Sequence, residues 1–180
     1  MSSQITEPDL TLPPTVPLLD KLTGDLLPAA LYTLVDMTPE ALLELQTMCE
    51  SEYADCGYEF TPGSNVTPAP RSHFVGEPLR AVIDYHVQMN QEHADDLKLD
   101  AIWFIVAFHQ DWNKHGVLLV TLDAGYCGDE EARGKPDAIK MKAVHSGIII
   151  AGLQVANTGW EETKQNYEIG TPCQEIQQSV

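Results

Sequence analysis

Two histidines and a carboxylate lie close together at His109, Asp111 and His115, in the polar connection HQDWNKHG. Imidazole and carboxylate groups are ligands of zinc and ferrous iron, so the trio could hold a metal. A metal site normally needs an orienting partner for each histidine, and none is evident here. The alternative is an ordinary polar turn. We therefore expect no metal and no other cofactor, and take His109 and Asp111 as candidate groups for general acid–base catalysis.

A further histidine, His86, lies on the apolar face of a predicted helix, three residues after Ile83. Asn90 falls in the same sector one turn later. Polar side chains in such a sector are either core groups with a backbone partner or groups that line a cavity. If they line a cavity, His86 is a candidate catalytic acid or base and Asn90 is a candidate substrate-binding residue.

Asp123 and Tyr126 come directly after a predicted strand. Sites in α/β proteins are commonly built where strands end. Gly125 and Gly128 stand on either side of Tyr126 and would let the backbone approach a ligand closely. The alternative is a flexible acidic loop. Asp123 and Tyr126 are therefore candidate catalytic residues.

Three ring-bearing side chains could contact a substrate at the rim of a pocket. His73 and Phe74 end the predicted long loop 58–76, and Trp112 lies within the HQDWNKHG connection. Loops of that length inside a compact domain are usually functional covers or disordered segments. The alternative is that these rings fasten their loops to the core. We take all three as candidate substrate-binding residues.

Two apolar runs, residues 102–108 and 117–122, must position most of these groups. Continuous apolar runs of about seven residues between turn residues are typical of strands that are covered on both faces. Further strands are predicted at 30–36 and 138–144, the second with the alternating pattern of an edge strand. The sequence therefore predicts an α/β (α+β) fold, with one mixed sheet of about four strands and helices packed on it.

Helices are predicted at three places. The first spans 39–54, because Thr38 can cap it and a proline follows at the first helical position. The second spans 77–93, and a capping box opens a short third helix at 158–167. Residues 146–156 are apolar on nearly all sides, so periodicity alone permits either a strand or a helix there.

The chain is long enough for one ordinary domain. Residues 1–16 are expected to form an extended or disordered arm, residues 17–168 a single α/β domain, and residues 169–180 a frayed tail. The first twenty residues contain no basic segment followed by an apolar run, and no stretch approaches the ~18 apolar residues of a membrane span. We therefore expect a cytoplasmic protein.

The segments PLLD, WFIVAF, VLLVTLD, AIKMKAVHS and GLQVANTGWEET, in this order, resemble an uncharacterised small α/β family of bacteria and fungi. In that family a strand ending in an aspartate is followed by a loop, a strand and two short helices separated by an asparagine. The matching positions here are Asp123, Asn157, and Trp160 with Glu161.

The resemblance covers roughly residues 17–167. The chain departs from the family pattern in the loop 58–76 and in the HQDWNKH connection. The resemblance implies that residues 146–156 are helical. It brings no known activity with it.

An excess of acidic side chains limits the partners. The chain has 27 Asp and Glu residues against 10 Lys and Arg, which gives a formal net charge of −17. Nucleic-acid backbones and anionic membranes are negatively charged and bind basic protein surfaces. We therefore expect neither as a partner of this acidic chain. No glycine-rich phosphate loop, GxSxG elbow or HExxH motif is present. The sequence therefore gives no support for nucleotide-driven chemistry, serine hydrolysis or zincin proteolysis.

These observations favour a cofactor-independent enzyme that acts on a small organic molecule. Isomerase, cyclase or lyase chemistry would need only one or two acid–base groups in an apolar pocket. The expected partner is the small-molecule substrate, and assembly into a homo-oligomer stays open. Two alternatives remain. One is an acidic interaction or inhibitor protein that binds a basic protein, and the other is a ligand-binding module without chemistry.

Overall fold

The two central apolar runs form neighbouring antiparallel strands, β3 (Trp103–Ala107) and β4 (Val117–Thr121). Every residue in both strands is buried. Ile105 of β3 lies opposite Leu119 of β4 and, on its other side, opposite Leu31 of the next strand. The core is therefore built around this strand pair, as the continuous apolar runs predict.

The computed structural model describes residues 7–19, 26–57, 60–93, 98–126 and 128–170. Within these residues, five α-helices pack against a single mixed sheet of five strands. The predicted α/β class is confirmed, with one strand more than the sequence indicates. Residues 1–6 of the predicted arm and 171–180 of the predicted tail lie outside the described residues.

The sheet has the strand order β2-β1-β3-β4-β5. β1 (Ala29–Thr33) runs parallel to both of its neighbours, β2 (Val66–His73) and β3. β5 (Asp137–Met141) runs antiparallel to β4 and forms the other edge. The edge position predicted for the alternating segment around residues 138–144 is confirmed.

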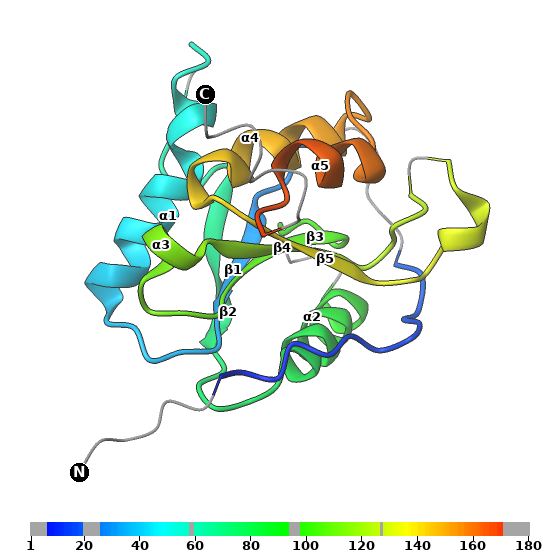
Figure 1. The fold of residues 1–180 in the computed structure, drawn as a ribbon, viewed down its shortest axis with the longest axis horizontal. Coiled ribbons are helices and arrows are strands. Elements are labelled where there is room, and N and C mark those ends of the chain that lie inside the picture. The colour runs from blue at the N-terminus through cyan, green and yellow to red at the C-terminus, as the bar shows by residue number, and fades with distance from the viewer. Residues whose placement is uncertain (1–6, 20–25, 58–59, 94–97, 127, 171–180) are drawn as a thin grey trace.

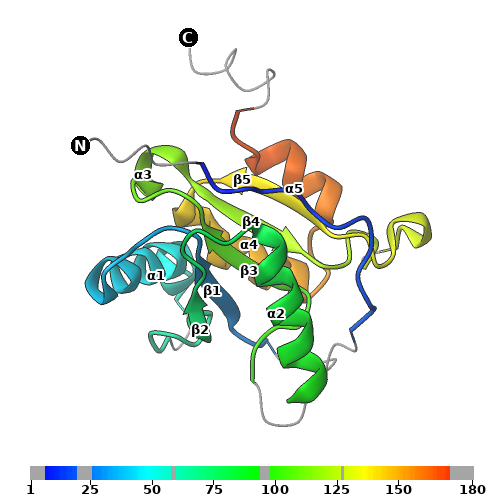
Figure 2. The same ribbon diagram turned by 90° about the horizontal axis from the view of Figure 1, so that it is seen from below.

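The helices lie on both faces of the sheet (Figures 1 and 2). They are α1 (Pro39–Ala54), α2 (Leu79–Glu92), α3 (Trp112–His115), α4 (Ala143–Gln154) and α5 (Trp160–Tyr167). α1, α3, α4 and α5 cover one face, and α2 with the extended segment 7–19 covers the other. The sheet is therefore the middle of three layers.

α1 has the predicted bounds because its first turn contains the expected signals. The hydroxyl of Thr38 accepts a hydrogen bond from the backbone N–H of Ala41 at 3.2 Å, and Pro39 occupies the first helical position. None of the helices in the described part of the chain is both long and apolar enough to cross a membrane.

Of the two structures that periodicity permits for residues 146–156, the chain forms the helix, which extends as far as Gln154. α4 starts at Ala143, so the last two residues of the predicted strand 138–144 belong to the helix instead. α4 is apolar on nearly all sides because it packs against both the sheet and α1. α5 follows after the turn that contains Asn157.

The prediction of a loop over residues 58–76 is wrong in its second half, because Val66–His73 form the edge strand β2. Pro68 and Pro70 argue against a strand, because proline cannot donate a hydrogen bond to the ladder. An edge strand tolerates them because only one side has a neighbour, and the register with β1 shifts once along its length. The connection HQDWNKHG also contains more than a turn, because the one-turn helix α3 lies within it.

Candidate functional site

His86 lies in the packed interface between α2 and the sheet, with its side chain fully buried. Its Nε2–H donates to the carbonyl oxygen of Asp100 at 3.1 Å, and its Nδ1 accepts from the hydroxyl of Tyr32 at 2.8 Å. The ring packs on Phe104, with centroids 4.5 Å apart. The buried Asn90 donates from Nδ2 to the carbonyl oxygen of His86 at 2.8 Å. Both residues therefore occupy positions expected of hydrogen-bonded core groups.

Burial makes His86 difficult to protonate. Loss of hydration lowers the pKa of His86 from 6.5 to about 4, although its backbone hydrogen bonds act in the other direction. The same burial raises the pKa of its partner Tyr32. Both side chains are therefore neutral near pH 7, which suits a structural hydrogen bond better than proton transfer.

We expect acid to destabilise the protein through His86. The unfolded chain binds a proton at this histidine near pH 6.5, whereas the folded chain does so only near pH 4. The contribution of neutral His86 to the free energy of unfolding is therefore complete above about pH 6.5 and is lost as the pH falls toward 4. It amounts to about 3 kcal/mol. Between pH 7 and pH 5, the free energy of unfolding should fall by roughly 2 kcal/mol more for wild type than for His86→Gln.

Urea denaturation at the two pH values measures this difference. The comparison uses the change with pH, so a lower starting stability of His86→Gln does not affect it. His109→Gln is the matched control, because the ring of His109 is only half-buried. A stability of His86→Gln that falls as steeply as that of wild type and the control would contradict the role given to His86.

His109, Asp111 and His115 shape the turn that leads into α3. The rings of the two histidines stack with centroids 3.7 Å apart, and Nδ1 of His109 accepts from the backbone N–H of Asp111 at 2.9 Å. The carboxylate of Asp111 in turn accepts from the backbone N–H of Lys114 and caps the helix. Across the described part of the chain, no three His, Cys, Asp or Glu side chains come together in a group that could hold a metal ion.

Asp123 closes the loop between β4 and β5. Its buried carboxylate accepts from Nε–H of Arg133 at 2.8 Å and from the backbone N–H of Gly134 at 3.0 Å. Tyr126 packs edge-on against Trp103, with ring centroids 5.2 Å apart. The carboxylate of Asp123 therefore fastens this loop to the end of β4, and Tyr126 covers the neighbouring core.

The three candidate substrate-binding rings lie in different surroundings and do not line one pocket. His73 is exposed at the end of β2, with Nε2 3.4 Å from the carbonyl oxygen of Met37. Phe74 is fully buried against Tyr32. Trp112 is nearly buried, and its remaining surface lines a groove of about 630 Å³ between α1 and α3.

The structure does not bring the five candidate catalytic residues together. His86 belongs to the α2 face of the sheet. His109 and Asp111 follow the end of β3, whereas Asp123 and Tyr126 follow the end of β4. β3 and β4 are antiparallel, so these two pairs lie at opposite ends of the sheet.

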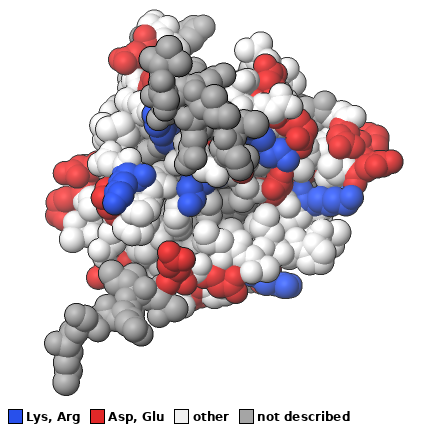
Figure 3. Space-filling model, viewed as in Figure 1, with Lys and Arg blue, Asp and Glu red and all other residues white. Residues whose placement is uncertain are grey.

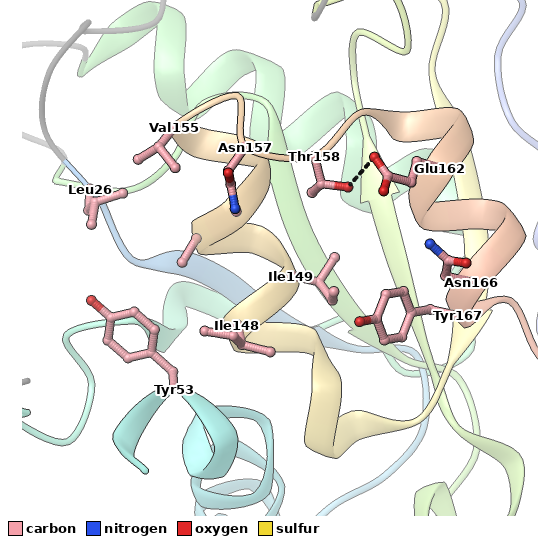
Figure 4. Close-up of a pocket in the computed structure, with 12 residues that line it drawn as sticks. Leu26, Tyr53, Ile148, Ile149, Val155, Asn157, Thr158, Glu162, Asn166 and Tyr167 are labelled. Carbon is pink, nitrogen blue, oxygen red and sulfur yellow. Dashed lines mark hydrogen bonds between the residues drawn. The ribbon is translucent and has the colours of Figure 1, made fainter. Parts of the chain in front are cut away.

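A different groove, of about 600 Å³, lies between α1, α4 and α5 and is lined by none of the residues singled out above as site candidates. Figure 4 shows Ile148 and Ile149 of α4 at its centre, with Tyr53 of α1 on one side and Tyr167 of α5 on the other. The groove therefore has an apolar floor between two aromatic rings.

The turn between α4 and α5 supplies the polar rim of this groove. Ala156 adopts a left-handed conformation, with φ of 54°, which ends α4. Asn157 and Thr158 follow and line the groove, and the hydroxyl of Thr158 donates to Glu162 at 3.3 Å (Figure 4). Asn157 therefore lies at the rim of the groove.

A histidine–carboxylate pair lies beside this groove, where α1 and α4 meet. Nδ1 of His145 is 2.9 and 2.8 Å from the two carboxylate oxygens of Glu52. The ring of His145 lies against the ring of Tyr167, which lines the groove, with centroids 5.6 Å apart. The side chains of His145 and Glu52 are 30% and 40% exposed, so both can be reached from solvent.

Sequence reasoning missed this pair. Once residues 143–154 are taken as a helix, His145 precedes Ile148 and Ile149 by three and four positions and shares their face. That spacing is the signal that could have found the histidine. Glu52 had no comparable signal, because it lies 93 positions away in the sequence.

The chain matches no protein-family model, no curated protein and no solved structure.

Proposed function

We propose that the protein is an enzyme that acts on a small organic molecule bound in the groove between α1, α4 and α5. The observation that carries this proposal is an apolar-floored groove with the Glu52–His145 pair beside it. The groove volume of about 600 Å³ lies within the roughly 300–1,000 Å³ that is typical of small-molecule sites. Such sites are mostly apolar and contain a few polar groups that orient the ligand.

His145 is the proposed general acid–base group. Its Nδ1 faces a carboxylate, which accepts hydrogen bonds, so Nδ1 carries a hydrogen. Within the described residues no hydrogen bond reaches Nε2, which leaves that atom to exchange a proton with a substrate. Glu52 holds this tautomer and stabilises the charge that His145 gains on taking a proton. Isomerase, cyclase or lyase chemistry of this kind needs no cofactor.

Filling the groove should block turnover. Ile148→Trp places a large ring on the groove floor, where the native side chain is only half-buried, so the core need not repack. Purified protein is incubated with a fractionated metabolite extract, and consumption is followed by mass spectrometry. A metabolite consumed by wild type should persist with Ile148→Trp.

The control variant Val75→Trp carries the same ring at a site between β2 and α2 that is 52% exposed. It should consume the metabolite at the wild-type rate. Equal consumption by Ile148→Trp and Val75→Trp would contradict the assignment of the groove.

An acidic interaction protein is the second candidate function, and the groove between α1 and α3 favours it. There Glu40 and Glu44 flank Leu43, which is 59% exposed. An apolar surface with carboxylates at its rim suits a basic amphipathic helix of a partner protein. A protein with this function would consume no metabolite, and its association with the basic partner should weaken as salt is raised.

A further inference from the structure

We propose further that the ligand of the groove between α1, α4 and α5 is an organic cation, an amine or quaternary ammonium compound with a small apolar body. This inference rests on the proposed function, because it concerns the same groove. It is tested by binding and not by turnover, so the two proposals can fail separately.

Aromatic rings stand on two sides of the groove. Tyr53 and Tyr167 lie on opposite sides of the isoleucine floor in Figure 4. The ring of Tyr53 also packs edge-on against the ring of Phe60, with a centroid distance of 6.3 Å. The faces of tyrosine rings attract cations, and alkylammonium groups combine that charge with apolar surface that can rest on isoleucine.

Among the residues that the structure describes, the groove lining contains one carboxylate and no basic side chain. Glu162 is the only charged residue among the described residues that line it. The nearby Lys164 of α5 is held elsewhere, by ion pairs to Asp137 at 3.0 Å and to Glu161 at 2.6 Å. Glu162 is therefore not neutralised by the lysine on its own helix, and its charge is available to a ligand.

The net charge of the whole chain has the same sign. The formal net charge of the chain is −17, and acidic side chains mark much of the outline of the molecule in Figure 3, including a group over the loop that contains η1 (Glu130–Ala132). A negative field of this kind raises the local concentration of cations and repels anions. Only a cationic ligand gains from the aromatic rings, from Glu162 and from this field together.

Choline and its neutral analogue, in which carbon replaces the quaternary nitrogen, test the inference directly. The two probes have the same shape and differ by one charge. Each is titrated into wild-type protein, and binding is followed through the NMR signals of the Tyr53 and Tyr167 rings. We expect choline to bind roughly tenfold more tightly than the neutral analogue.

Two neighbouring variants separate a local contact from the general field. Glu162→Gln and Glu161→Gln each remove one negative charge from α5, so they change the long-range field alike. Only Glu162 lines the groove, whereas Glu161 pairs with Lys164. Glu162→Gln should lose most of the preference for choline, and Glu161→Gln should keep it.

Equal binding of the two probes, no binding of either probe at its solubility limit, or an equal loss in both variants would overturn the cation inference. These results would leave the acid–base proposal standing, because that proposal depends on turnover. Conversely, a preference for choline together with turnover that Ile148→Trp leaves unchanged would support the cation site and contradict the assignment of turnover to this groove.

Discussion

Glu50→Ala is expected to lower the free energy of unfolding by about 3–5 kcal/mol. Glu50 is 2% exposed, and its carboxylate accepts from the backbone N–H groups of Gly63, Asn65 and Val66 at 3.0, 3.1 and 3.0 Å. Alanine would leave all three donors without this acceptor, and each buried unsatisfied donor costs roughly 1–3 kcal/mol. The loss is therefore much larger than for an exposed carboxylate.

Urea denaturation followed by circular dichroism measures this effect. Glu44→Ala is the matched control, because Glu44 lies on the same helix and is exposed. Its unfolding free energy should stay within about 0.5 kcal/mol of the wild-type value. Glu50→Gln keeps one acceptor oxygen and should fall between the two. A stability of Glu50→Ala equal to that of Glu44→Ala would show that the carboxylate does not hold the backbone before β2.

The same contact explains why the sequence does not predict β2. The strand contains Pro68 and Pro70, and its local pattern is that of a loop. Tertiary contacts order the strand. Glu50 on α1 binds the backbone at its start, and β1 pairs along its length. Local pattern carries no information about such partners.

The elements that could be predicted are those whose signals are local. The buried pair β3 and β4 follows from two continuous apolar runs, and α1 follows from the cap at Thr38 and the proline after it. The sequence leaves residues 146–156 ambiguous between helix and strand for a physical reason. A helix packed on several sides and a strand buried on both faces give the same apolar run.

The candidate site could not be predicted in the same way. A histidine on an apolar helix face has the same spacing whether it lies in a core or lines a cavity, and His86 proves to be hydrogen-bonded within the core. Glu52 and His145 meet only because α1 packs on α4 in the folded chain. Convergence of side chains from distant segments is a property of packing and not of any single motif.

His145→Gln is expected to lower kcat by roughly 10²–10⁴-fold, the usual contribution of general acid–base catalysis. Glutamine keeps a polar side chain beside Glu52 but cannot exchange a proton at neutral pH. The pair is partly exposed, at 30% and 40%, so its loss should change the unfolding free energy by only about 0–1 kcal/mol. A large loss of rate with an intact fold distinguishes catalysis from a merely structural ion pair.

The most direct test is the rate at which wild type, His145→Gln and His109→Gln consume the same metabolite from the extract. The proposed function predicts a roughly 10²–10⁴-fold slower rate for His145→Gln and the wild-type rate for His109→Gln, with similar thermal unfolding for all three proteins. Consumption by His145→Gln at the wild-type rate would contradict the role given to the Glu52–His145 pair, and no consumption by wild type would contradict the enzyme itself.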